Sequence, residues 1–241
     1  RDILSEINRP VITYGLSPQA DFFAESMNFN EIRTQFSVKH HQESLGEITL
    51  NVPGEHNILN SLACIALGME MGIPFETIAT GLHSYGGVRR RFEVKGIVDD
   101  IMVVDDYAHH PEEIKATLNL ARILKPKKII VIFQPHRFSR FKNLYFDFKK
   151  TLKKCDKLYV SDVYAAGEKK INYLSKERFV NEINKNKKNF AKTLDNFNHL
   201  PKIILNEAER GDIVIFVGAG DISKWVNDLP SKLKKLKNLN V

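Results

Sequence analysis

The sequence predicts an α/β protein whose larger part is a doubly wound, mostly parallel sheet. From residue 92 onward, apolar runs with the length of buried strands alternate with segments of helical periodicity. This alternation is typical of parallel strands joined by right-handed helical crossovers. Before residue 84 the order differs, because strands come first and helices follow. The intervening run Ser-Tyr-Gly-Gly-Val-Arg-Arg-Arg does not suit the interior of a helix or strand. We therefore expect two domains, 1–88 and 89–241, with a Rossmann-like fold in the second.

The first domain is predicted to contain short strands followed by two helices. The predicted strands are residues 11–14, 31–38 and 45–52. The strongest predicted helix covers residues 55–71, since Ile58, Leu62 and Ile65 recur on one face. A second helix is expected from residue 74 to about residue 83, after a glycine that ends the first.

The second domain is predicted to alternate strand and helix. The predicted strands are residues 92–98, 101–104, 128–133, 157–160 and 212–217. The predicted helices are residues 112–124, 141–154, 175–184 and 195–209, with a closing helix that begins at residue 222. The run 128–133 is mostly apolar and flanked by turns, as expected of a strand buried on both faces.

The charge and composition of the chain limit the kinds of molecule that it is expected to bind. The net charge of +7 is compatible with nucleic acid or with small anionic substrates. Much of the excess lies in lysine pairs and in the lysine-rich tail, which is typical of solvated helix faces. The sequence has no zinc-finger spacing and no aromatic-basic motif of an RNA-binding sheet, so no nucleic-acid partner is expected. The sequence has no apolar run of about 18 residues and no signal-peptide pattern, so we expect no contact with a membrane. Its two cysteines are far apart in sequence, which does not suggest a disulfide framework, and we expect a cytoplasmic protein.

Polar residues follow four of the predicted strands of the second domain. They occupy the segments 105–111, 134–140, 161–168 and 218–221. Ligands of doubly wound sheets bind beyond the carboxyl ends of the strands, on loops held by the rigid sheet. We therefore expect the functional site at this edge.

The first of these segments allows more than one interpretation. Asp106 and Tyr107 could hold a ribose and stack on a base, although a carboxylate at this position could equally begin a turn or cap a helix. His109 and His110 suggest a metal pair, but adjacent residues rarely face one site. Contact of one histidine with substrate is therefore favoured, and no metal site is expected within this chain.

The second segment indicates an anion site. Arg137 and Arg140 lie about one turn apart, next to His136, and guanidinium groups form paired hydrogen bonds with carboxylate or phosphate. Two surface arginines at a helix start are the alternative, but cations are unfavourable there unless an anion accompanies them.

Two further groups of residues are weaker signals. His56, Asn57 and Asn60 occupy the first turn of the predicted helix 55–71, where amides could read an adenine edge or merely cap the helix. Gly218 and Gly220 allow close approach of the backbone after a strand. No Gly-x-x-x-x-Gly-Lys-[Ser/Thr] phosphate loop occurs.

Together, these residues resemble the Mur ligase family, most closely its members that join L-alanine to UDP-N-acetylmuramate. The matching segments, in family order, are residues 53–60, 90–93, 105–111, 134–140, 162–168 and 218–221. The resemblance implies the end of a central ATP-binding domain followed by a whole amino-acid-binding domain. The phosphate loop and the Mg²⁺ ligands of the family lie upstream of the matched region, so this chain is expected to be inactive alone.

The resemblance also implies a reaction and a set of residue roles. ATP phosphorylates the lactyl carboxylate of UDP-N-acetylmuramate, and the amine of L-alanine attacks the acyl phosphate, in peptidoglycan precursor synthesis. The residues matched to ATP binding are His56, Asn57, Asn60, Arg91, Asp106 and Tyr107. The residues matched to the amino-acid site are His136 and the catalytic candidates His109, Arg137 and Arg140.

Two alternatives remain open at this point. A related recycling ligase that attaches a wall tripeptide shares the Asp/His-His-Pro loop, but it should lack the block 136–140 that is present here. A non-catalytic basic α/β binding module is supported by the charge alone. The sequence does not predict an oligomeric state.

Overall fold

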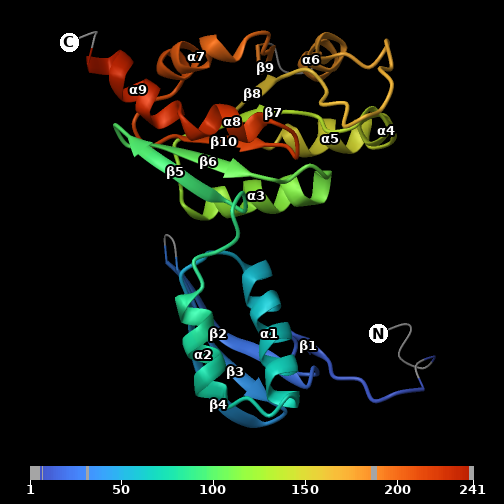
Figure 1. Cartoon of the computed structure of the whole chain (residues 1–241), viewed down its shortest axis with the longest axis vertical. Coiled ribbons are helices and arrows are strands. Elements are labelled where there is room, and N and C mark those ends of the chain that lie inside the picture. The colour runs from blue at the N-terminus through green and yellow to red at the C-terminus, as the bar shows by residue number, and fades with distance from the viewer. Residues whose placement is uncertain (1–5, 7, 31–32, 186–188, 239–241) are drawn as a thin grey trace. The chain divides into compact units, whose positions relative to one another are not determined.

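The computed structural model describes residues 6, 8–30, 33–185 and 189–238 (Figure 1). The chain divides into two compact units, Arg1–Gly87 and Val88–Val241. Each unit has its own hydrophobic core. Within the described residues, no helix combines the length and the apolar character needed to cross a membrane.

The first unit is a four-stranded sheet covered by two helices. The strands are β1 Tyr14–Gly15, β2 Phe22–Asn30, β3 Arg33–His40 and β4 Glu43–Leu50, in that spatial order. β1 is parallel to β2, and the remaining neighbours are antiparallel. The helices are α1 Glu55–Glu70 and α2 Phe75–Ser84. Ile58, Leu62 and Ile65 of α1 are fully buried against the sheet, which confirms the predicted apolar face.

Strand β2 was missing from the sequence-based prediction. Its register shifts between Glu25 and Asn28, and Ser26 adopts a positive φ of 53°. A bulge of this kind breaks the two-residue alternation that identifies a strand in sequence. Hydrogen bonding to β3, rather than a local pattern, therefore defines β2.

The second unit contains a six-stranded sheet. Its strands are β5 Glu93–Val98, β6 Ile101–Asp106, β7 Ile129–Phe133, β8 Lys157–Val160, β9 Ala191–Thr193 and β10 Ile213–Val217. The spatial order is β5-β6-β10-β7-β8-β9. Only the β5–β6 pair is antiparallel among the pairs described, so the sheet is mostly parallel. The last strand in sequence, β10, is thus inserted between β6 and β7.

Helices cover both faces of this sheet. They are α3 Pro111–Ile123, α4 Phe138–Asn143, α5 Tyr145–Leu152, α6 Lys176–Asn184, α7 Leu200–Glu207, α8 Ile222–Asn227 and α9 Leu229–Asn238. Helices α3 to α6 pack on one face, against alternate strand residues such as Val131 and Phe133. Helices α7 to α9 pack on the other face, against residues such as Ile132 and Phe216. The predicted doubly wound α/β fold is confirmed.

Two predicted helices differ in detail. The predicted helix 141–154 is two helices, α4 and α5, which meet at Leu144, where the backbone leaves helical geometry (φ −111°, ψ 20°). The predicted helix 195–209 is a short 3₁₀ turn, Phe197–His199, followed by α7. Pro201 lies in the first turn of α7, because a proline is accommodated where no N–H is needed. β9 was not predicted, since three residues carry too little pattern.

Candidate active site at the strand ends

The carboxyl ends of four neighbouring strands lie in one row. In the strand register, Asp106 of β6 is beside Val217 of β10, Val217 is beside Phe133 of β7, and Phe133 is beside Val160 of β8. The loops that follow these strands therefore leave the same edge of the sheet. Sequence reasoning placed the candidate residues on these loops, and the register brings the loops together.

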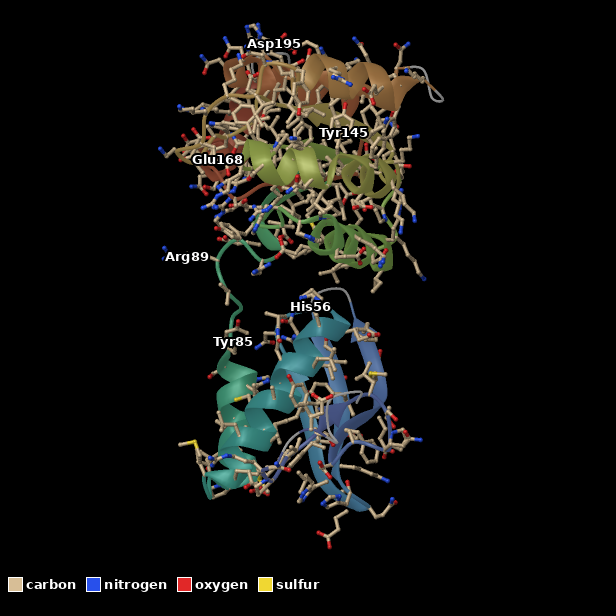
Figure 2. All side chains as sticks on the ribbon, turned by 90° about the vertical axis from the view of Figure 1, so that its right-hand side faces the viewer. His56, Tyr85, Arg89, Tyr145, Glu168 and Asp195 are labelled. Atoms are coloured by element: carbon tan, nitrogen blue, oxygen red, sulfur yellow. The ribbon has the colours of Figure 1, made fainter. Side chains whose placement is uncertain are left out.

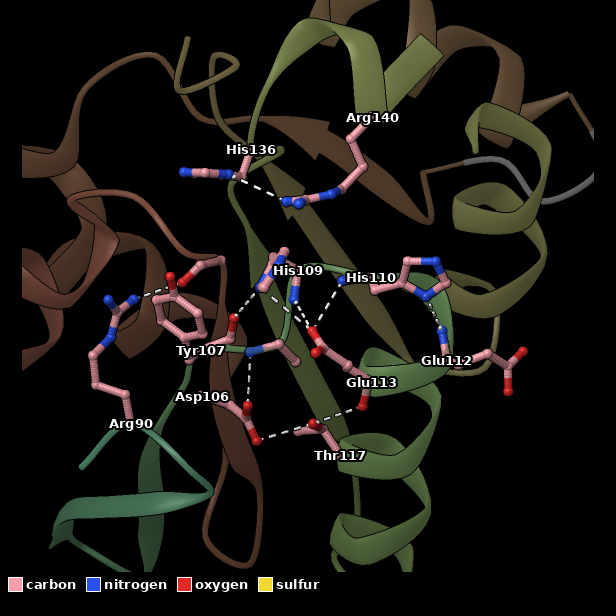
Figure 3. A network of polar contacts seen from close by, with 12 residues as sticks. Arg90, Asp106, Tyr107, His109, His110, Glu112, Glu113, Thr117, His136 and Arg140 are labelled. Carbon is pink, nitrogen blue, oxygen red and sulfur yellow. Dashed lines mark hydrogen bonds and ion pairs between the residues drawn. The ribbon is translucent and has the colours of Figure 1, made fainter. Parts of the chain in front are cut away.

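Asp106 anchors the loop that follows β6 (Figure 3). Its side chain is almost completely buried. Oδ1 accepts a hydrogen bond from the N–H of Ala108 at 2.8 Å, and Oδ2 accepts bonds from Thr117 Oγ1 at 2.9 Å and the N–H of Phe92 at 3.1 Å. Burial raises the pKa of Asp106, and these donors partly oppose that effect. The carboxylate thus joins the residue just before β5, the loop after β6 and α3.

Arg90 holds the start of the second unit against the same edge. Its Nη2 donates to the carbonyl of Gly218 at 2.6 Å, and its Nε lies 3.5 Å from the fully buried carboxylate of Asp105. The guanidinium also lies over the ring of Tyr107, 4.8 Å from the centroid. Burial is the main cause that raises the pKa of Asp105, and Arg90 opposes it. Sequence reasoning did not single out Arg90, although the run of three arginines was the available signal.

His109 and Glu113 interact closely at the start of α3. Nδ1 of His109 lies 3.0 Å from the carbonyl oxygen of Tyr107 and 3.4 Å from Oε2 of Glu113. Oε2 of Glu113 also accepts the backbone N–H groups of His109 at 2.9 Å and His110 at 3.2 Å. His110 caps α3 instead, because its Nδ1 accepts the N–H of Glu112. His109 therefore contacts Glu113, whereas His110 caps the helix, and Figure 3 shows their rings well apart.

His136 and Arg140 form the neighbouring part of the site. Nη1 of Arg140 lies 3.3 Å from Nδ1 of His136, and the ring centroids of His136 and His109 are 5.8 Å apart. Burial lowers the pKa of His136, and the positive charges of Arg140 and Arg137 lower it further. His136 is therefore neutral at pH 7 and can be a hydrogen-bond donor without carrying charge.

The loop after β8 supports this arginine-bearing segment. The rings of Tyr164 and His136 are stacked with centroids 5.5 Å apart, and the N–H of Arg137 donates to the carbonyl of Tyr164. Glu168 accepts both the N–H and the hydroxyl of Ser139, and the hydroxyl bond is the first cause of its lowered pKa. Arg137 has a positive φ of 67°, which these contacts maintain.

Gly220 is required for packing between these loops. A Cβ at this position would overlap Oε1 of Gln134 and lie 2.6 Å from Cγ of Tyr164. Gln134 is buried and donates through Nε2 to Asp221 at 2.9 Å. The glycine therefore has a packing reason that is independent of any nucleotide.

Gly220→Ala is expected to lower the free energy of unfolding by roughly 1–3 kcal/mol, because the added methyl group must displace Gln134 or Tyr164. The urea-unfolding midpoint measures this change. Gly81→Ala is the matched control, since nothing lies within 4 Å of its Cβ position inside α2. It should stabilise the protein slightly, as alanine favours a helix over glycine. Equal midpoints for Gly220→Ala and the parent would contradict this explanation.

The first unit carries the other predicted residues. Figure 2 shows His56 at the amino-terminal end of α1. Asn57 donates through Nδ2 to the carbonyl of Pro53 at 2.7 Å, a bond that ties the first turn of α1 to the residue before its glycine N-cap but satisfies no N–H of the helix. Asn57 and Asn60 also line a largely apolar pocket of about 540 Å³ between α1 and α2. The amides thus border a cavity large enough for a flat heteroaromatic ring.

In the part of the chain that the structure describes, no three His, Cys, Asp or Glu side chains are grouped so that they could hold a metal ion.

Family models match both units. The model described as "Mur ligase middle domain" matches residues 1–68, and the model described as "Mur ligase, glutamate ligase domain" matches residues 90–220. The chain belongs to the Mur ligase family. The resemblance carried by the sequence motifs is thereby confirmed.

Individual Mur ligases resemble the chain over nearly its whole length. A UDP-N-acetylmuramate–L-alanine ligase of Geotalea uraniireducens (strain Rf4) is 43% identical over 233 residues, which are 97% of this chain and 51% of that protein. The crystal structure of a UDP-N-acetylmuramate–alanine ligase from Thermotoga maritima has a TM-score of 0.75 and 28% identity, over 95% of this chain and 48% of its own. A murein peptide ligase of Psychrobacter arcticus 273-4 has a TM-score of 0.61 and 22% identity, over 92% of this chain and 46% of its own, and shows likeness of fold alone. The chain spans about half the length of the curated relatives it matches.

The structure of this Mur ligase chain distributes the predicted site residues over its two units. The second unit gathers the strand-end candidates Asp106, Tyr107, His109, His136, Arg137 and Arg140 at one edge of the sheet. Arg91 reaches the same edge, with its guanidinium 5.9 Å from the ring centroid of Tyr107. His56, Asn57 and Asn60 belong to the first unit. Glu113 and Thr117 support the site but were not predicted, because charged and hydroxyl residues are ordinary in the first turns of a helix.

Proposed function

We propose that the chain is the part of an ATP-dependent ligase that receives L-alanine and joins it to the lactyl carboxylate of UDP-N-acetylmuramate. The observation that carries this proposal is the 43% identity, over 97% of the chain, to a protein of that name. The reaction proceeds through an acyl phosphate and serves peptidoglycan precursor synthesis in the cytoplasm. The remaining half of the relatives' length is expected to supply the UDP-sugar site and the phosphate loop.

The edge of the second unit has the chemistry that an amino acid requires. Arg137 and Arg140 are two guanidinium groups beside a neutral His136, and such groups hold a carboxylate by paired hydrogen bonds. His109 faces His136 across 5.8 Å between ring centroids. A small zwitterion held by its carboxylate leaves its amine free for the acyl phosphate. Positioning of this kind supplies much of the rate enhancement in group transfer.

ATP has candidate contacts in both units. Asn57 and Asn60 border the pocket of the first unit and suit an adenine, and His56 lies at the same helix start. In the second unit, Arg91 suits phosphate. Asp106 suits a ribose hydroxyl only through lone pairs that its three internal hydrogen bonds leave free. The described residues hold no group of three His, Cys, Asp or Glu side chains suited to a metal ion, and we expect the Mg²⁺ ligands outside this chain.

Phosphate release by the full-length protein tests the proposal. The assay supplies ATP, Mg²⁺ and UDP-N-acetylmuramate with L-alanine, glycine, L-serine, D-glutamate or the wall tripeptide as acceptor. Release that depends on L-alanine is expected. Release that depends on the tripeptide would assign the protein to wall recycling. Absence of release with every acceptor would leave a Mur ligase fold that binds or regulates.

A further inference from the structure

The neighbours of His109 determine which of its ring nitrogens carries hydrogen. Nδ1 lies 3.0 Å from the carbonyl oxygen of Tyr107 and 3.4 Å from Oε2 of Glu113. A carbonyl oxygen and an ionised carboxylate can only accept hydrogen bonds. Nδ1 must therefore carry the hydrogen, and in the neutral ring Nε2 has the free lone pair.

Glu113 is ionised and firmly held in this arrangement. Burial by itself raises the pKa of Glu113, but the N–H donors of His109 and His110 and the nearby imidazole outweigh burial and keep the pKa below its ordinary value. The backbone bonds of 2.9 and 3.2 Å fix Oε2 beside Nδ1. The carboxylate thus also offers a negative charge to the imidazole if that ring gains a proton.

His136 has the opposite arrangement. A guanidinium group can only donate, so Nδ1 of His136 must accept the hydrogen bond from Arg140 at 3.3 Å. The hydrogen of the neutral ring is then on Nε2. The site therefore pairs a histidine that offers a lone pair with a histidine that offers an N–H, at a centroid distance of 5.8 Å.

We propose that His109 is the general base that removes a proton from the incoming ammonium group, and that Glu113 is the positioning residue that keeps Nε2 of His109 free to do so. This inference rests on the proposed function. His136, with the two arginines, holds the carboxylate of the same amino acid. Glu113 acts only through His109 and does not touch the substrate.

The proton and electron balance of the step is complete. The ammonium group gives one proton to Nε2 of His109 and becomes a neutral amine. Its electron pair forms the C–N bond with the carbonyl carbon of the acyl phosphate. The C–O bond to phosphate breaks, and phosphate leaves with that electron pair and takes the second nitrogen proton. The imidazolium then returns its proton to solvent.

The charges around His109 favour this assignment. Glu113 of α3 is the carboxylate in contact with the ring. The rings of Tyr107 and His109 are nearly perpendicular, with centroids 5.1 Å apart. His136 is neutral at pH 7, so it does not oppose a positive charge on His109. Arg140 and Arg137 follow β7 and act on His136, while Arg91 acts on Glu113. The carboxylate of Glu113 is therefore the charged group in direct contact with the ring.

A comparison of the rates with two nucleophiles, L-alanine and hydroxylamine, distinguishes a general-base role of the His109–Glu113 pair from a merely structural one. Hydroxylamine is uncharged at neutral pH and traps acyl phosphates as hydroxamates without first losing a proton. In the full-length protein, His109→Gln is expected to lower kcat with L-alanine roughly 100- to 10,000-fold, the usual worth of a general base. Glu113→Gln is expected to lower it roughly 10- to 100-fold, as loss of an orienting partner usually does. In both variants the fall in kcat with L-alanine should clearly exceed any fall in the rate of hydroxamate formation.

Glu112→Gln is the matched control. Glu112 is the adjacent residue of α3, but its carboxylate is exposed and pairs with Lys115 at 2.9 Å. It should behave as the parent with both nucleophiles. An equal fall with L-alanine and hydroxylamine in Glu113→Gln would show a merely structural role and overturn the inference, as would an unchanged kcat with L-alanine. Failure of the parent itself to form a hydroxamate from ATP and UDP-N-acetylmuramate would instead overturn the proposed function.

Discussion

Arg140→Ala in the full-length ligase is expected to raise the KM for L-alanine roughly 10- to 100-fold and to leave the KM for ATP unchanged. A hydrogen bond between charged groups contributes about 1.5–3 kcal/mol, and each 1.36 kcal/mol corresponds to a factor of about ten. Arg140 also donates to Nδ1 of His136, so its loss removes the partner that orients the neighbouring ring. Arg137→Ala should act in the same direction.

Steady-state kinetics with each substrate varied in turn measures this effect. Arg178→Ala is the control, because Arg178 is an exposed arginine of α6 that pairs with Glu182 at 3.1 Å and belongs to none of the loops that follow β6, β7, β8 or β10. It should leave both KM values unchanged. If neither Arg137→Ala nor Arg140→Ala changes the KM for L-alanine, the carboxylate is held elsewhere.

Asp106→Ala is expected to lower the free energy of unfolding by about 3 kcal/mol, in addition to any loss of ATP affinity. The substitution deprives three donors of their acceptor: the N–H groups of Phe92 and Ala108 and the hydroxyl of Thr117. An unsatisfied buried donor costs roughly 1–3 kcal/mol. Burial of the carboxylate is itself unfavourable and raises its pKa. Because the alanine variant no longer buries this charge, part of the cost of the three unsatisfied donors is offset.

Urea unfolding and calorimetric titration with ATP separate the two roles of Asp106. Reduced stability with unchanged ATP affinity would remove Asp106 from the nucleotide site and leave it as the anchor of the loop. Unchanged stability would show that the loop does not depend on its buried hydrogen bonds. Thr117→Val, which removes one donor and keeps the shape, should cost less than Asp106→Ala.

The pH dependence of stability has a defined sign at Asp106. Burial raises its pKa in the folded state above the 3.8 of a solvent-exposed aspartate. Its contribution to stability is therefore fully present below pH 3.8 and is lost as the pH rises through the folded-state pKa. In Asp106→Asn this loss should disappear. The free energy of unfolding of that variant should then vary less than the parent's between pH 4 and neutrality.

Local pattern explains which elements could be predicted. β7 and β10 were predicted well because Ile129–Phe133 and Ile213–Val217 are buried on both faces and therefore apolar throughout. α1 was predictable because its buried residues recur with helical spacing. β2 was not, since its bulge at Glu25 to Asn28 interrupts the alternation. α7 begins later than predicted because a 3₁₀ turn precedes it.

Some residues of the candidate site could likewise be predicted from the sequence, and others could not. His109, His136 and Arg140 could be identified because each follows a strand, where polar residues are rarely needed for packing. Glu113 could not, because an acidic residue in the first turn of a helix is ordinary in any sequence. Its contact with Nδ1 of His109 exists only in the folded loop.

By itself, the sequence determined most of the elements, the Mur ligase family and the residues that stand at the strand ends. Only the tertiary structure decided that Asp106 anchors a loop, that Gly220 makes room for Tyr164, and which polar groups lie beside Nδ1 of His109 and of His136. β10, the last strand in sequence, lies between β6 and β7 and brings together Gln134 with Asp221 and Arg90 with Gly218, which are 87 and 128 positions apart. The hydrophobic periodicity of a segment indicates on which face of its helix or strand each residue lies. Contacts between elements depend on strand order and loop conformation, which no local pattern encodes.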